Sequence, residues 1–193
     1  PNDTNRIDYV TIASTGDAAD FGDLTDARHG GPGVSSPTRA ICMGGYDGSA
    51  YVDVIDYVTI ATTGNAADFG DLTAAKSAGT GVSSGIRAVA IGGVGSPAIV
   101  NTMDFVTIAT TGNATDFGDT VAPYEHTGSV NNSIRGVICG ARTPSYLNIL
   151  ESITIATTGN STDFGDAVNL PFSLASGASP TRGIFAGGSI PTS

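Results

Sequence analysis

Two histidines are the side chains of this 193-residue chain best suited to acid–base or metal chemistry. His29 and His126 occupy nearly corresponding places in two copies of an internal repeat, so they could face each other across an axis and bind a metal ion. Two histidines without neighbouring cysteines are, however, more typical of exposed loop residues. We therefore expect no metal site from them.

A second candidate for chemistry is the motif Asp-Phe-Gly-Asp, which occurs four times, beginning at Asp20, Asp68, Asp116 and Asp163. Kinases use Asp-Phe-Gly to bind magnesium, but their catalytic His-Arg-Asp loop and strand lysine are missing here. Calcium could use the clustered carboxylates, yet the Asp-rich loop with a later glutamate is absent. Aspartates also stabilise turns through their own backbone, and we expect no metal and no cofactor at this motif.

The third candidate is an arginine that recurs once in every repeat, at Arg39, Arg87, Arg135 and Arg182. Four guanidinium groups could surround a central anion. They could instead form half-buried pairs with a repeated carboxylate, because the arginine fork suits a carboxylate partner. The candidate partners are the Asp-Phe-Gly-Asp aspartates and the acids at Asp8, Asp56, Asp104 and Glu151. Repetition in all four units favours the structural role.

Composition excludes several functions. The net charge is -10 and Lys76 is the only lysine, which argues against binding along a phosphate backbone and hence against nucleic acid. No apolar stretch approaches the length of a membrane-spanning helix. The sequence has no nucleophile elbow, phosphate-binding loop or zinc-protease motif. We expect a protein that is not an enzyme, with Cys42 and Cys139 as small buried residues.

The element that must position all these residues is a repeat of about 48 residues. Its copies begin at Ile7, Ile55, Met103 and Leu150, at offsets of 48, 48 and 47. The repeat units lie near 7–54, 55–102, 103–149 and 150–193. They fill the chain, so residues 1–193 are predicted to form a single domain.

Each unit is predicted to contain four short antiparallel strands. The apolar run 40–43 precedes Gly44-Gly45 and is typical of a buried strand. The run 7–13 is rich in β-branched residues and ends at Thr15-Gly16-Asp17, which indicates a tight hairpin. Four strands in about 45 residues are typical of a propeller blade.

The chain begins in the third strand of a blade and ends after the second. We therefore expect an all-β, four-bladed propeller whose last blade is closed by the N-terminal strands, because closure removes exposed sheet edges. Two alternatives are a fragment and a larger ring shared between subunits, which would be a homo-oligomer.

One face of such a ring would present the connections that differ between copies. Aromatic side chains and positive charge gather in these connections, and aromatic loops on a rigid scaffold commonly form binding surfaces. The candidate binding residues are Arg28, His29, Tyr46, Tyr51, Tyr124, His126, Arg142, Tyr146 and Phe172.

The repeats resemble kelch repeats. The doubled glycines Gly44-Gly45, Gly92-Gly93 and Gly187-Gly188 match the kelch hallmark. Aromatic residues also stand where kelch blades place them, at Tyr9, Tyr57 and Phe105 and at Phe21, Phe69, Phe117 and Phe164. The resemblance implies a kelch-like propeller in which the recurring phenylalanines and arginines are structural.

The Thr-Ile-Ala-Thr-Thr-Gly-Asn segments also resemble repeats in virion and tail proteins of bacteriophages, especially those of cyanobacteria. This resemblance implies a component of a virion (tail, fibre or capsid surface) that contacts other virion proteins, cell-surface proteins or a host glycan. The alternatives are a bacterial extracellular or periplasmic binding module and a carbohydrate-active propeller enzyme.

Overall fold

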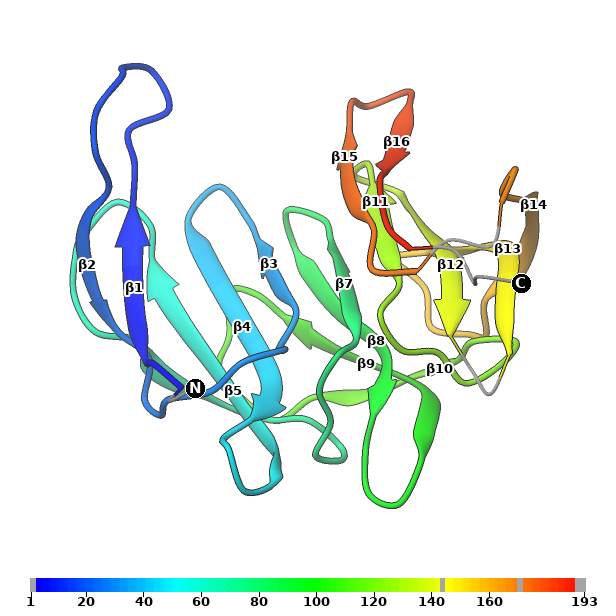
Figure 1. Cartoon of the computed structure of the whole chain (residues 1–193). Coiled ribbons are helices and arrows are strands. Elements are labelled where there is room, and N and C mark those ends of the chain that lie inside the picture. Colours follow the sequence, from blue (N-terminus) through cyan, green and yellow to red (C-terminus); the bar gives the residue numbers. More distant parts are fainter. Residues whose placement is uncertain (1–2, 143–144, 170–171, 190–193) are drawn as a thin grey trace.

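The computed structural model describes residues 3–142, 145–169 and 172–189, and they form an all-β molecule (Figure 1). Sixteen strands are paired antiparallel in five sheets, three with four strands and two with two strands. No helix occurs in these described ranges, and thus none that could cross a membrane.

The three four-stranded sheets have the same topology, in which each strand pairs with its neighbour along the chain. The first sheet contains β3 (Gly33–Ser35), β4 (Arg39–Tyr46), β5 (Tyr51–Thr59) and β6 (Ala67–Asp71). The second contains β7 (Thr80–Ser83), β8 (Arg87–Val94), β9 (Ile99–Thr107) and β10 (Thr115–Asp119). The third contains β11 (Gly128–Asn131), β12 (Arg135–Arg142), β13 (Tyr146–Thr154) and β14 (Thr162–Asp166).

Two hairpins flank these sheets. The N-terminal hairpin pairs β1 (Arg6–Tyr9) with β2 (Ala19–Asp23), and the C-terminal hairpin pairs β15 (Ala175–Ala178) with β16 (Gly183–Ala186). In the repeat, β1 and β2 correspond to the third and fourth strands of a sheet, and β15 and β16 to the first and second. The prediction of four short antiparallel strands per unit is confirmed for the three complete sheets.

Successive sheets pack face to face through apolar side chains. In the first interface, Ile41, Met43 and Ile55 of the β3–β6 sheet contact Ala90 and Ile108 of the β7–β10 sheet in one buried cluster. The next interface repeats this arrangement between the β7–β10 and β11–β14 sheets. The first strands β3, β7, β11 and β15 also contact one another in order, so the sheets follow each other in an arc (Figure 1).

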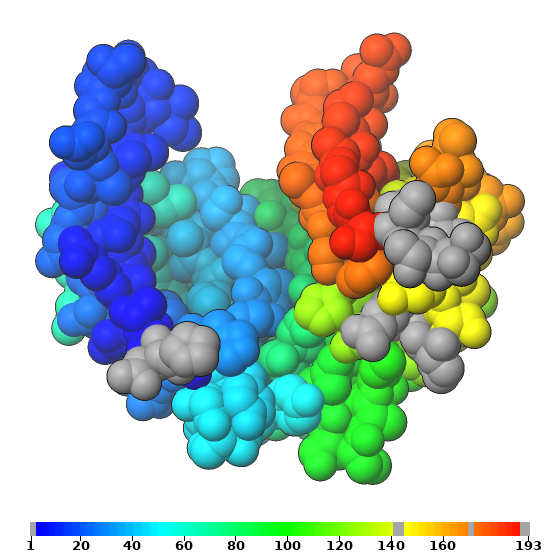
Figure 2. Space-filling view, in the orientation of Figure 1, coloured from blue at the N-terminus to red at the C-terminus, as the bar shows by residue number. Residues whose placement is uncertain are grey.

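The predicted fourth sheet is not formed within the chain. The N-terminal hairpin and the C-terminal hairpin pair only within themselves, and Figure 2 shows them standing apart with an open gap between them. Each hairpin is held by its own neighbouring sheet: Gly64 N–H donates to Phe21 O at 2.7 Å, and β15 and β16 contact β11. The described residues form no sheet that joins the two hairpins, so the prediction of closure within one chain is not confirmed.

Candidate binding face

A pocket of about 630 Å³ opens among the connections that differ between copies. Its polar and aromatic lining comes from His29, Tyr46, Tyr51, Glu125 and His126, and we call it the loop pocket. The remaining lining residues are small, namely Gly30, Gly31, Ser77, Ala78, Gly79, Val94, Thr127 and Ser173. Four of the nine predicted binding residues therefore meet in one concave site.

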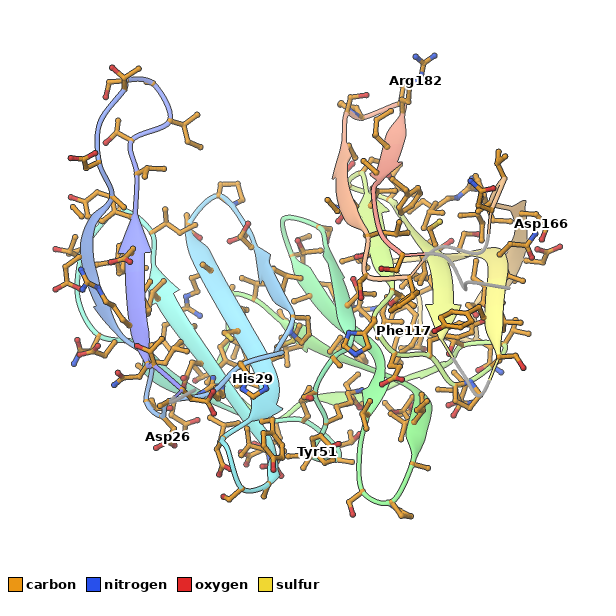
Figure 3. All side chains as sticks on the ribbon, in the orientation of Figure 1. Asp26, His29, Tyr51, Phe117, Asp166 and Arg182 are labelled. Atoms are coloured by element: carbon orange, nitrogen blue, oxygen red, sulfur yellow. The ribbon has the colours of Figure 1, made fainter. Side chains whose placement is uncertain are left out.

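Strand register brings the aromatic side of the loop pocket together. Tyr46 ends β4 directly opposite Tyr51 at the start of β5, and their rings lie 5.4 Å apart at 64°. The backbone of His29 bridges to Tyr46, and the imidazole ring lies 5.7 Å from the Tyr46 ring. Asp3 orients His29, because its Oδ1 lies 2.8 Å from Nδ1. Figure 3 shows His29 and Tyr51 on the same side of the molecule.

A chain of backbone hydrogen bonds links the equivalent connections of successive units. Ala78 N–H donates to Gly30 O at 2.7 Å, His126 N–H to Ala78 O at 2.9 Å, and Ser173 N–H to His126 O at 2.7 Å. All four residues have φ between 55° and 74°, so one turn geometry is repeated from unit to unit. These hydrogen bonds give the loop pocket one wall of regular backbone, whereas the side chains on that wall differ from unit to unit.

The opposite side of the loop pocket is polar. His126 Nε2 lies 3.8 Å from Glu125 Oε2, and Glu125 stands where the first two units have His29 and Ser77. Two tyrosines, two imidazoles and one carboxylate offer ring faces for stacking beside hydrogen-bond donors and acceptors. This combination suits a neutral ligand rich in hydroxyl groups. The described residues contain no group of three or more His, Cys, Asp or Glu that could hold a metal ion.

Arg28 and Tyr124 were predicted to lie on this face, and for both residues the prediction is wrong. Both are buried. Arg28 Nη2 lies 2.8 Å from Asp56 Oδ2, and the hydroxyl of Tyr124 donates to Glu151. In the first and third units this side chain therefore points inward, where it pairs with the acid of the sheet that follows.

Lys76 holds the equivalent position in the second unit and lies 2.7 Å from Asp104. The hydroxyls of Thr25 and Thr73 donate to the same carboxylates, Asp56 and Asp104. The repeated acid therefore ties the connection before each sheet to that sheet's third strand.

The sequence favoured a pair between the recurring arginine and a repeated carboxylate, but in the first two complete sheets the arginine bridges to the next sheet instead. Arg39 Nη1 donates to Ile108 O at 2.8 Å, and Arg87 Nη1 donates to Ile155 O at 3.1 Å. Each guanidinium also covers an aromatic ring, at 4.6 Å from the Tyr57 centroid and 4.2 Å from the Phe105 centroid. Arg135 lies 5.9 Å from the Phe164 ring, whereas Arg182 stands at the free tip of the C-terminal hairpin (Figure 3).

Two other predicted binding residues, Tyr146 and Phe172, do not line the loop pocket. Tyr146 and Phe172 contact each other, with ring centroids 5.0 Å apart. The side chain of Arg142 lies outside the described part of the structure. Of the recurring phenylalanines, Phe21, Phe69 and Phe117 are buried and Phe164 is exposed.

Sequence reasoning missed Asp3 and Glu125. Both lie in segments that differ between the copies, so a search for every charged residue in those segments would have found them.

A comparison with protein-family models gives no match for this chain, and a search of curated proteins gives no significant match.

Buried Tyr124 makes stability sensitive to alkaline pH. Burial, followed by the hydrogen bond to Glu151 and its charge, raises the pKa of the Tyr124 phenol well above its usual range. A pKa that is higher in the folded chain than in the unfolded chain gives stability that is complete below about pH 10 and is lost as pH rises further.

We expect the free energy of unfolding to fall by about 1.4 kcal/mol per pH unit above about pH 10 from this group. Urea unfolding between pH 8 and pH 11.5 measures the slope, and Tyr124→Phe should reduce it. Burial raises the pKa of Cys139 to about 11, and this thiol is present in both the wild-type chain and the Tyr124→Phe variant, so it does not affect the comparison. Equal slopes in the two proteins would contradict the assignment to Tyr124.

Proposed function

We propose that this chain is a non-enzymatic, β-propeller-type module that uses the loop pocket to bind a glycan. The observation that supports this most strongly is the meeting of Tyr46, Tyr51, His29, His126 and Glu125 in one pocket among the segments that differ between copies. Stacking surfaces beside polar groups are what a sugar ring with its hydroxyl groups requires.

The propeller-type assignment is supported by three equivalent four-stranded antiparallel sheets whose first strands contact in order. The backbone hydrogen bonds from Gly30 to Ser173 follow the same order. Such repetition gives a rigid frame on which loops can vary without loss of the fold.

A binding role is favoured over catalysis because the repeated charged residues already have structural partners. Arg39 and Arg87 bind carbonyl oxygens of the next sheet, and Asp56 is buried against Arg28. The residues left free to vary are those of a recognition surface. By the resemblance of its repeats, we place the module in a phage virion, as part of a tail, fibre or capsid surface that contacts a host glycan or another surface protein.

The test is a glycan-array screen with the purified chain, followed by calorimetric titration of any hit. We expect Tyr46→Ser/Tyr51→Ser to weaken binding at least about tenfold, because loss of central aromatic contacts commonly removes more than about 1 kcal/mol of binding free energy. Tyr146→Ser is the matched control: it removes an aromatic ring from the same face but outside the loop pocket.

Circular dichroism and thermal unfolding must show that all variants fold. Glycan binding that is unchanged in Tyr46→Ser/Tyr51→Ser would reject the loop pocket. Mass-spectrometric detection of cleaved glycan after incubation would favour the enzyme alternative.

A further inference from the structure

The described residues contain sixteen strands, which is enough for four four-stranded sheets, but they complete three such sheets. The missing sheet is present as two halves at opposite ends of the arc, with β15 and β16 at one end and β1 and β2 at the other (Figure 1). A free edge of backbone donors and acceptors remains on β16 and on β1, and such edges are ready to pair.

At the end of the arc next to β14, apolar surface lies open that is covered elsewhere. Phe164 is 50% exposed, whereas its equivalents Phe69 and Phe117 are each 2% exposed. In the complete interfaces, Phe69 O and Phe117 O accept hydrogen bonds from Gly112 N–H and Gly159 N–H, each at 2.7 Å. In those interfaces the turn between the third and fourth strands of the next sheet provides the cover, and the described residues place no such turn against β14.

The surroundings of Gly165 differ in the same way from those of its equivalents Gly70 and Gly118. A Cβ at Gly118 would lie 2.5 Å from Gly159 C and O, and a Cβ at Gly70 would lie 2.5 Å from Gly112 C. Gly165 has the same sequence context, but among the described residues, its two chain neighbours aside, no atom lies within 4 Å of its Cβ position. The fourth copy thus keeps a glycine suited to the close approach of a turn, although no turn of the described residues lies against it.

At the other end of the arc, an apolar pocket of about 360 Å³ opens between the N-terminal hairpin and the β3–β6 sheet. We call it the N-terminal notch; Ile7, Ala40, Cys42 and Val58 are among its lining residues. In the next sheet the equivalents of Ala40, Cys42 and Val58 are all buried under the preceding sheet, and they are Ala88, Ala90 and Val106. Ile60 is 45% exposed, whereas its equivalent Ile108 is 1% exposed.

The side chains that could fill these openings are exposed on the opposite hairpins. Ile184 of β16 corresponds to Ile41, which packs against the next sheet, yet Ile184 is 56% exposed. Ile12, which follows β1, corresponds to Ile108 and is 98% exposed. A second pocket of about 360 Å³, lined by Val137, Leu150 and Phe164, lies beside the C-terminal hairpin. Each end of the chain therefore displays the apolar side chains that the other end lacks.

We propose that two copies of this chain join head to tail into a ring of eight sheets. In this ring, β16 of each copy pairs with β1 of the other copy, as β4 pairs with β5. The observed register Ile41 to Tyr57 and Met43 to Ile55 then places Ile184 opposite Tyr9 and Ala186 opposite Ile7. Arg182 covers the Tyr9 ring of the second copy, as Arg39 covers Tyr57.

The number of copies follows from the packing. Closure within one chain would require the well-packed sheet interfaces to change angle, because the two hairpins stand apart while those interfaces are already buried. Two copies give eight sheets, three would give twelve, and propellers typically have about four to eight. A two-fold axis makes the two junctions identical and leaves no free edge.

Disulfide trapping tests both the partner and the register. In a Cys42→Ala/Cys139→Ala background, one copy carries Tyr9→Cys and another carries Ile184→Cys. These replacements are compatible with the repeat, because Ala90 is the equivalent of Cys42 and Ala186 is the equivalent of Cys139. A small residue is also tolerated at the position of Tyr9, where the fourth copy has Ser152. We expect mild oxidation of the mixture to give a covalent dimer, since opposite Cβ atoms lie about 4.5–5.5 Å apart. The control pair, Val10→Cys with Ile184→Cys, is shifted by one residue onto the other face of the strand and should trap poorly.

Native mass spectrometry and Cys42 labelling provide a second measurement that does not need a disulfide. The wild-type chain should have twice the mass of one chain, and Cys42 should be labelled slowly because the second copy covers the N-terminal notch. Ile184→Asp should give single chains in which Cys42 is labelled at least tenfold faster. Ile86→Asp, at an exposed residue in the turn between β7 and β8, should change neither the mass nor the labelling rate.

Three results would overturn the proposal. The first is a single chain at every concentration, and the second is a disulfide formed within one chain carrying both cysteines. The third is an assembly larger than two copies. None of them bears on glycan binding by the loop pocket, so this proposal can fail while the proposed function stands.

Discussion

Replacement of Arg28 by methionine is expected to lower the free energy of unfolding by about 3–5 kcal/mol. The Arg28 and Asp56 side chains are 1% and 0% exposed and lie 2.8 Å apart. Methionine would fill much of the space but leave the carboxylate buried with only the Thr25 hydrogen bonds. Urea unfolding followed by circular dichroism measures the change, provided that the dependence on urea concentration stays the same.

Two further variants separate the buried charge from side-chain size. Arg28→Lys should retain most of the stability, because Lys76 makes the equivalent contact with Asp104. Arg6→Met removes a pair of the same 2.8 Å length that is exposed to solvent, and it should have little effect. A small loss in Arg28→Met, equal to that in Arg6→Met, would show that the buried pair does not stabilise the fold.

The repeat predicted the strands well because every copy faces the same physical demands. The apolar run before Gly44-Gly45 lies in β4, since alternation and β-branched residues favour extended chain wherever they occur. The run 7–13 overlaps β1 only at residues 7–9, and residues 10–13 lie in the connection after the strand. The Thr15-Gly16-Asp17 segment does lie between two paired strands, but residues 10–18 form the connection, so the hairpin is longer than the tight turn that was predicted.

The wrong predictions share one physical cause, which is that sequence spacing does not show which face of a neighbour a side chain meets. The recurring arginine and the recurring acid looked like partners. Instead, Arg39 reaches a carbonyl of the next sheet, and Asp56 is met by Arg28 from the connection before its own sheet. In the third unit a phenol, Tyr124, replaces the cation, so no single residue type marked the buried position.

The repeat also could not show whether the N-terminal and C-terminal hairpins pair within one chain. The two terminal halves complement each other in sequence equally well within one chain and between two. The angle between packed sheets decides whether the two halves can meet within one chain. That angle depends on the shapes of side chains such as Met43 and Ile108 in the interfaces. The loop pocket also depends on packing between sheets. The sequence marked its residues as members of variable loops, but it did not show which of them meet in one pocket.

The sharpest test of sheet packing compares alanine at Gly118 with alanine at Gly165. The five residues Thr115–Asp119 and Thr162–Asp166 have the same sequence, and the two glycines have φ of 136° and 137°. Backbone strain and effects on the unfolded chain are therefore equal for the two substitutions. The difference is the turn around Gly159, whose backbone lies 2.5 Å from the Cβ position at 118, while position 165 is open.

We expect Gly118→Ala to lower the free energy of unfolding by about 1–3 kcal/mol more than Gly165→Ala, because overpacking against backbone must be relieved by a shift between sheets. Both should be measured in the Ile184→Asp background, where the proposed junction between copies is open. Equal losses would show that the sheets do not approach as closely as the structure places them. With Ile184 restored, Gly165→Ala should prevent association of two copies, since its Cβ would then meet the Gly16 turn of the second copy as position 118 meets Gly159.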